Sequence, residues 1–109
     1  MDKDERRAQI AERILEDRYA RYVLFPSELF DEYAWNMLLV LFVAKQRGHV
    51  LSESGLIAGV NVGTREGQRW LYQLAKDGQI KPRSIRQDVV LTSAAIEKLR
   101  KYLDATDVH

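Results

Sequence analysis

The sequence predicts a mainly α-helical (α+β) fold in which five helical segments accompany one short β-hairpin. Three observations support this. Apolar residues recur at spacings of three and four along five segments; capping residues, glycines and a proline separate these segments; and two short apolar stretches flank a basic turn. The length of 109 residues fits a single domain, residues 1–109.

A proline separates the first two predicted helices. We expect the first helix to begin at Asp2 or Asp4, and Phe25-Pro26-Ser27 to end it, because the residue before a proline avoids helical backbone. Asp31 then caps a second helix. Its middle, Met37–Ala44, is apolar nearly all round, so we expect this helix to run through the core.

Two capped helices follow, with a tight turn between them. Ser52 is a good N-cap for a short third helix, Glu53–Ala58. Asn61 tolerates the left-handed backbone that a tight turn requires. Thr64 is expected to cap a fourth helix, Arg65–Asp77, and Gly78 follows it. These elements predict a helix–turn–helix.

The remainder of the chain predicts a hairpin and a last helix. Two apolar stretches between residues 79 and 92 predict strands joined by a basic tip. Thr92 or Ser93 caps a last amphipathic helix. A helix–turn–helix over residues 52–77, followed by a β-hairpin wing over 79–92, is the order of a winged helix–turn–helix.

The net charge of +1 is unevenly distributed. Residues 60–88 contain six cations and three anions, giving +3, whereas residues 23–59 sum to −2 and both ends are balanced. Clustered lysine and arginine bind polyanions because they release counterions from a phosphate backbone. The charge pattern therefore favours a nucleic-acid contact over residues 60–88.

The helix–turn–helix segment resembles the MarR-type transcriptional regulators of bacteria. The motifs that support the resemblance are Leu51-Ser52-Glu53-Ser54-Gly55-Leu56, Gly63-Thr64, Arg69-Trp70-Leu71 and Leu74-Ala75-Lys76-Asp77-Gly78-Gln79-Ile80. Phe25-Pro26-Ser27-Glu28-Leu29-Phe30 and Ala34-Trp35-Asn36-Met37-Leu38-Leu39 resemble the entry to the second helix in a subgroup of that family. The resemblance covers roughly residues 20–103. It implies a dimeric regulator that binds double-stranded DNA.

Three positions depart from the family pattern. Asn61 stands where a turn glycine is usual, and Gln68 stands at a commonly apolar position. The stretch from Ile80 to Thr92 is shorter than the usual wing.

If the fourth helix lies in a major groove, its first turn faces base edges. Arg65 can then bind a guanine, Gln68 an adenine, and Glu66 a cytosine amino group. We expect the recognition helix, residues 64–77, in the major groove and the hairpin tip, residues 82–88, at the minor groove. The candidate DNA contacts are Ser52, Ser54, Thr64, Arg65, Glu66, Gln68, Arg69, Lys76, Arg83 and Arg86.

Other interpretations stay open at this point. The charges of the fourth helix can simply be solvated, or a basic winged helix can dock an acidic protein partner, which an exposed Trp70 would favour. We expect no enzyme and no cofactor, because no serine has a nearby histidine–aspartate pair. His49 has no second ligand nearby, so we expect no metal site.

The end helices, residues 1–22 and 93–109, each have an apolar stripe that we expect to pair in a homodimer. The alternative is that both helices fold back on their own domain. Whether a small-molecule effector binds near Tyr19, Tyr22, Phe25 and Trp35 stays open. The expected interface residues are Ile10, Ile14, Leu15, Tyr22, Leu99, Tyr102 and Leu103.

The N-terminal segment and the cysteine count bear on location. Met1–Ala20 is densely charged where a signal peptide would need an apolar stretch. The absence of cysteine excludes a disulfide framework. We therefore expect a cytoplasmic, nucleoid-associated protein.

Overall fold

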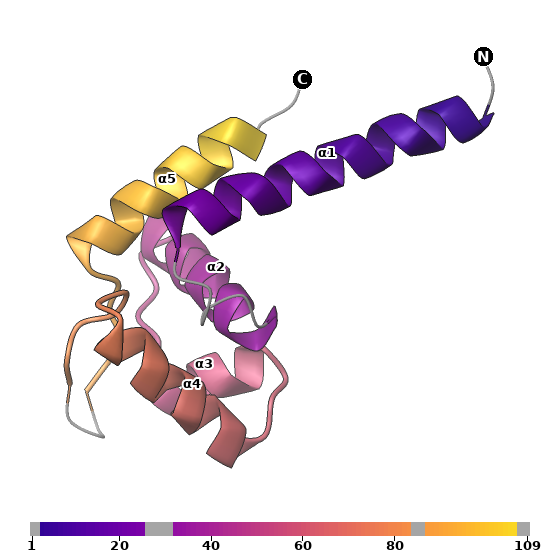
Figure 1. The fold of residues 1–109 in the computed structure, drawn as a ribbon. Helices are drawn as coiled ribbons and strands as arrows, with labels where there is room; N and C mark the ends of the chain where they lie inside the picture. The colour runs from indigo at the N-terminus through magenta and orange to yellow at the C-terminus, as the bar shows by residue number, and fades with distance from the viewer. Residues whose placement is uncertain (1–2, 26–31, 84–86, 107–109) are drawn as a thin grey trace.

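The computed structural model describes residues 3–25, 32–83 and 87–106. Its helices lie in two groups joined by α2 (Figure 1). At one end the long α1 lies beside α5, and at the other end α3 and α4 lie together. The bounds are α1 Lys3–Leu24, α2 Glu32–Gln46, α3 Glu53–Gly59, α4 Thr64–Lys76 and α5 Ser93–Thr106.

The core is built around α2, which packs against α3, α4 and α5. One side of α2 is buried, as its apolar sequence predicts, and includes Met37, Leu38 and Leu41. The helix runs through the core as expected, but not all of its apolar residues are covered, since Val43 is 44% exposed and Leu39 is only half-buried. The outer side of this helix is therefore apolar and open.

The turn between α3 and α4 forms as the sequence predicts. The Ser52 hydroxyl accepts the Gly55 N–H at 3.1 Å and caps α3. Asn61 adopts a φ of 57°, in the left-handed region. Gly67 allows α4 to approach α3, since a Cβ there would lie 2.6 Å from Cγ1 of Ile57.

Thr64 does not cap α4, contrary to the sequence-based expectation. Gly63 is the N-cap, with extended backbone at φ −64° and ψ 151°, and Thr64 is the first helical residue. The Gly63 carbonyl accepts the Gly67 N–H at 2.8 Å, so the helical hydrogen bonds begin one residue earlier.

The predicted β-hairpin wing over residues 79–92 is wrong. The described residues there form no strand, only the isolated bridge Ile80↔Leu91, while Val89 bridges to Leu51. Pairing is divided between two neighbours: the Lys81 N–H donates to the Val90 carbonyl at 2.8 Å, whereas the Val89 N–H donates to the Leu51 carbonyl at 2.9 Å. The segment instead contributes apolar side chains, with Ile80, Val89 and Leu91 buried in the core.

The C-terminal part of α1 is held by aromatic packing, and its N-terminal part extends away from the body (Figure 1). The Trp35 ring meets the rings of Phe25 and Tyr102 edge-on, with centroids 5.3 and 4.9 Å away. The Arg21 guanidinium lies over Trp35 at 5.0 Å. Residues 3–16, here called the α1 arm, are exposed wherever their side chains are described.

The hydroxyl of Thr92 accepts the Ala95 N–H at 3.1 Å, so Thr92, rather than Ser93, caps α5. Within the described part of the chain, no helix combines the length and the apolar character that crossing a bilayer requires.

Candidate nucleic-acid interface

The outer side of α4 is charged and its inner side is apolar. Gly67, Leu71 and Leu74 are buried, whereas Arg65, Glu66, Gln68, Arg69 and Lys76 are exposed. Trp70 is half-buried and packs against the core. Its indole N–H is buried and finds no acceptor among the described residues. The exposed aromatic residue of α4 is instead Tyr72.

Four of the outer residues form one line along the helix. Arg65, Arg69, Tyr72 and Lys76 are spaced by four, three and four residues, which places them on the same side. Tyr72 is 70% exposed at the middle of this line. The sequence-based candidates omitted Tyr72, although its helical spacing from the cations was the signal that could have found it.

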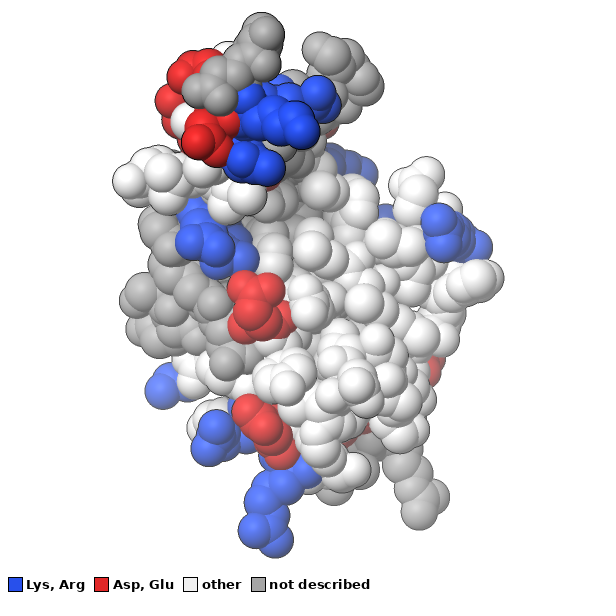
Figure 2. All heavy atoms as spheres, turned by 90° about the vertical axis from the view of Figure 1, so that its right-hand side faces the viewer, with Lys and Arg blue, Asp and Glu red and all other residues white. Residues whose placement is uncertain are grey.

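The cations of this line have no intramolecular partners. No ion pair or hydrogen bond joins the side chains of Arg65, Arg69 or Lys76 to another residue of the described ranges. Lysine and arginine side chains also gather at the end of the molecule away from α1, where α4 lies (Figures 1 and 2). These charges are therefore free to meet an external anion.

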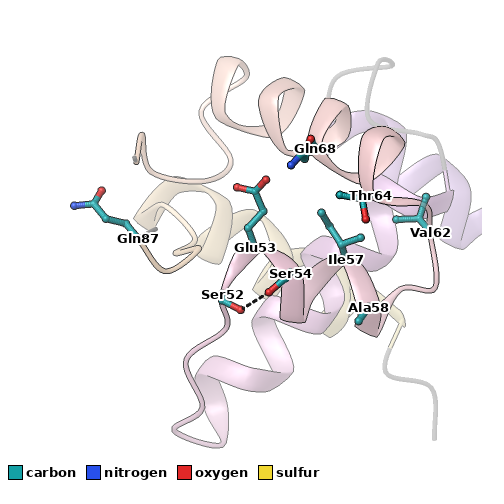
Figure 3. A pocket seen from close by; sticks show the side chains of 9 residues that line it. All are labelled: Ser52, Glu53, Ser54, Ile57, Ala58, Val62, Thr64, Gln68 and Gln87. Atoms are coloured by element: carbon teal, nitrogen blue, oxygen red, sulfur yellow. Dashed lines mark hydrogen bonds between the residues drawn. The ribbon is translucent and has the colours of Figure 1, made fainter. Parts of the chain in front are cut away.

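A hollow of about 620 Å³ lies between the N-terminal ends of α3 and α4 (Figure 3). It brings together four predicted contacts, Ser52, Ser54, Thr64 and Gln68, around a floor formed in part by Ile57. The two serine hydroxyl oxygens lie 3.3 Å apart. The hollow thus presents hydroxyl and amide groups beside the exposed cations of α4. Its lining residues are Ser52, Glu53, Ser54, Ile57, Ala58, Val62, Thr64, Gln68 and Gln87.

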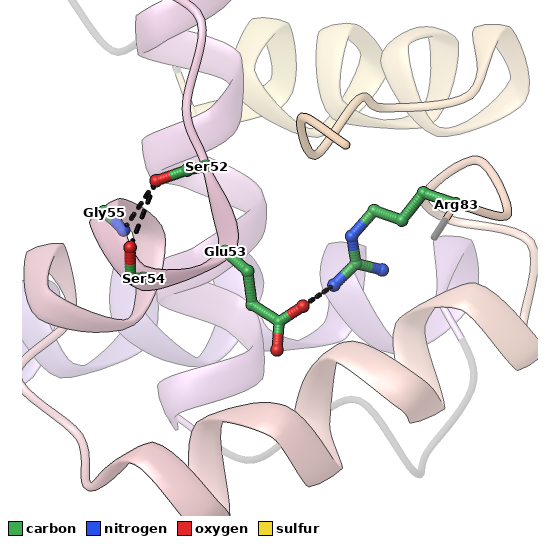
Figure 4. Close-up of polar contacts among 5 residues, drawn as sticks. All are labelled: Ser52, Glu53, Ser54, Gly55 and Arg83. Atoms are coloured by element: carbon green, nitrogen blue, oxygen red, sulfur yellow. Dashed lines mark hydrogen bonds and ion pairs between the residues drawn. The ribbon is translucent and has the colours of Figure 1, made fainter. Parts of the chain in front are cut away.

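Arg83, predicted as a groove contact at the hairpin tip, is held in an ion pair within the chain. Its Nη2 donates to Oε2 of Glu53 at 2.9 Å (Figure 4). The two side chains are only 11% and 19% exposed. The pair neutralises the acidic residue that lines the hollow and ties the segment after α4 to the first turn of α3. The other predicted tip residue, Arg86, lies outside the described residues.

The predicted dimer interface is partly closed. Leu99 is fully buried against the core, because α5 packs its apolar side on α2, and it cannot face a partner. Tyr102 is half-buried against Trp35, and Leu103 is also half-buried. On α1, Ile14 and Leu15 are both 47% exposed. The side chains of Ile10 and Tyr22 lie outside the described part of the structure.

The Tyr102 phenol belongs to the aromatic cluster between α1, α2 and α5. Burial raises its pKa above the ordinary value of 10.0, and the Asp17 carboxylate adds to this. The described residues contain no group of three or more metal-ligating side chains of the His, Cys, Asp or Glu types. Phe25 and Trp35, considered as lining for an effector cleft, are buried core residues.

Comparisons with protein-family models, with curated proteins and with solved structures give no match to this chain. The resemblance to MarR-type regulators therefore remains an interpretation of its motifs.

Proposed function

We propose that the protein binds double-stranded DNA through α4 and acts as a homodimeric transcriptional regulator in the cytoplasm. The observation that supports this most directly is the line of exposed cations on α4, Arg65, Arg69 and Lys76, none of which is paired within the described chain. Unpaired cations in a row match the regular spacing of charge along a phosphate backbone.

The position of α4 suits insertion into a major groove, which is about 12 Å wide and admits one α-helix. Arg65, in the first turn, would meet base edges and bind a guanine through O6 and N7. Arg69 and Lys76 would contact phosphates farther along the helix. The Tyr72 hydroxyl would donate a hydrogen bond to the oxygen of a phosphate between them.

The hollow between α3 and α4 suits the DNA backbone beside that groove. The hydroxyls of Ser52, Ser54 and Thr64 can donate to phosphate oxygens. An unpaired carboxylate there would repel a phosphate. The ion pair between Glu53 and Arg83 removes most of that repulsion.

The test is fluorescence anisotropy of the full chain on a duplex of about 30 base pairs across a salt series. We expect affinity to fall by orders of magnitude between about 50 and 200 mM salt. The double variant Arg65→Ala/Arg69→Ala should bind at least about tenfold more weakly, with a salt slope smaller by about 0.9 per lost phosphate contact.

The matched control is Arg100→Ala/Lys101→Ala, which removes the same charge from exposed positions on α5. It should bind like the wild type. Equal losses in both double variants would indicate attraction by net charge alone. Absence of binding at low salt would overturn the proposal.

One observation favours a second candidate, an acidic protein partner. Tyr72 lies exposed between Arg69 and Lys76, and tyrosine and arginine are among the residues that most often dominate protein interfaces. This candidate predicts that Tyr72→Ala abolishes capture of an acidic protein while the chain shows no affinity for duplex DNA.

A further inference from the structure

The outer side of α2 forms a stripe with opposite charges at its two ends. Glu32, Asn36, Val43 and Arg47 are exposed, and Leu39 and Val40 are half-buried. Spacings of three or four place Glu32, Asn36, Leu39, Val40 and Val43 on one side of α2, opposite the buried Leu38 and Leu41. Arg47 comes directly after the last residue of α2, and its N–H donates to the Val43 carbonyl at 3.1 Å, one turn back. We call these six residues the α2 stripe. A helix that is apolar on both sides is normally covered on both.

The stripe lies in a hollowed apolar surface. A hollow of about 370 Å³ is lined by Leu39, Val40, Val43, Ala44, Arg47, His49 and Leu51. A second hollow, of about 320 Å³, lies between α1 and α2, and Leu39 lines both. The apolar surface extends from Leu39 to the neighbourhood of Val50, which is 69% exposed. The second hollow is instead mostly polar, because Asp17, Arg18, Arg21, Glu32 and Asn36 line it. Figure 2 shows a broad face of uncharged side chains below the α1 arm.

When the stripe is reversed and laid on itself, its acidic end meets its basic end and its apolar centre meets its apolar centre. An antiparallel copy centred between positions 39 and 40 places Leu39 opposite Val40 of the second chain. It also places Asn36 opposite Val43, and Glu32 opposite Arg47. The Glu32 side chain is 75% exposed, and among the described residues its ion pair is a long one, 3.8 Å to Arg21. Arg47 is exposed, and its side chain forms no hydrogen bond or ion pair with another described residue.

We infer that a second copy of this chain packs on the α2 stripe, with the two α2 helices antiparallel about a two-fold axis. A purely acidic or purely basic partner would satisfy one end of the stripe and oppose the other. A second copy satisfies both ends and covers the apolar middle, which is the self-complementarity that a two-fold interface needs.

Two helices alone bury less than the roughly 800 Å² per partner of a standard interface. Ile14, 47% exposed on the α1 side of the second hollow, adds an apolar contact, and the polar residues of that hollow surround it. This inference rests on the proposed homodimer. It places the centre of the interface on α2 instead of on the two end helices, because Leu99 of α5 is buried within its own chain. Self-association can be measured without DNA, so the two proposals can fail separately.

The test is sedimentation velocity of the full chain without DNA, from about 1 to 100 µM, the range of ordinary reversible dimers. We expect a reversible dimer, with Val43→Glu raising its dissociation constant at least about tenfold. The control is Val23→Glu, at an 84% exposed position of α1, which should dimerise like the wild type. A wild type that is monomeric at 100 µM, or loss of the dimer in Val23→Glu but not in Val43→Glu, overturns the inference.

A charge exchange tests the antiparallel arrangement with little risk to folding, since both sites are exposed. Glu32→Arg and Arg47→Glu should each weaken the dimer, and the double variant should recover most of the loss. A double variant weaker than either single variant would overturn the antiparallel pairing. Circular dichroism establishes that each variant is folded, and if Val43→Glu does not fold, the charge exchange alone decides.

Discussion

The outer faces of α2 and α4 differ although both helices pack into the same core. The outer face of α4 has three unpaired cations, whereas that of α2 has leucine and valine between one acid and one cation. The outer face of α4 suits a polyanion, whereas the outer face of α2 suits an apolar partner with charges at its edges. Because the two helices contact each other, the core that positions one face also positions the other.

The largest expected effect is on stability, and it differs between the buried and the outer side of α2. Leu38→Ala should lower the free energy of unfolding by about 2–5 kcal/mol, because Leu38 is fully buried and the substitution leaves a cavity. Its neighbour Leu39 lies half-buried on the outer side, so Leu39→Ala should cost about 1 kcal/mol or less. Urea unfolding of dilute protein measures both. Equal losses would mean that α2 is enclosed on both sides within one chain.

The next effect concerns the packing that positions α4. Gly67→Ala should cost about 1–3 kcal/mol, because the added Cβ would meet Ile57 at 2.6 Å. It should also weaken DNA binding, since α4 must shift away from α3. Gly59→Ala is the control, because its added Cβ would meet Val40 Cγ1 only at 4.0 Å, an ordinary contact distance. If both variants unfold at the same urea concentration, the close contact between α3 and α4 is wrong.

Removal of Arg83 should leave the Glu53 carboxylate, which lines the hollow, without its cationic partner. Arg83→Gln should lower the free energy of unfolding by about 1–3 kcal/mol and reduce DNA affinity, because Glu53 is left unneutralised. The double variant Glu53→Gln/Arg83→Gln should recover most of the affinity. Failure of the double variant to recover it, in the same anisotropy assay, would mean that Arg83 itself contacts DNA.

A smaller effect is expected at the start of α3. Ser52→Ala should cost about 1 kcal/mol, because it removes the hydroxyl that accepts the Gly55 N–H. Ser54 lies two residues later, and its hydroxyl contacts only the Ser52 hydroxyl among the described residues, so Ser54→Ala should change the melting temperature little. A reversed order of the two melting temperatures would contradict the cap.

The smallest effect is the titration of Tyr102. Its pKa is raised in the folded state, so folding favours the protonated phenol, and this contribution is lost as pH rises above 10.0. The unfolding free energy of the wild type should therefore fall more steeply above pH 10.0 than that of Tyr102→Phe. Parallel curves would indicate an unburied phenol.

Helix positions, the cap at Ser52 and the left-handed Asn61 followed from local chemistry. These features depend on neighbours a few residues apart, where spacing and side-chain type are sufficient evidence. The outer face of α4 followed from the same periodicity, because its buried leucines fix which side is left exposed.

The differences between expectation and structure have a common cause: periodicity identifies an apolar face but not what covers it. Leu99 was expected in an interface between chains and is buried within one. Arg83 was expected at a minor groove and pairs with Glu53, thirty residues earlier in the chain. Val89 was expected to pair across a hairpin and bridges to Leu51 instead. Each outcome depends on contacts between segments far apart in sequence.

Local sequence therefore determined where the helices of this protein lie and which of their sides are polar. The partners of Arg83, Leu99 and Val89 were decided by packing, because distant segments compete for the same apolar surface and the same charges. The open α2 stripe is the same kind of outcome: its composition alone predicted burial, and the arrangement of the other helices left one side uncovered.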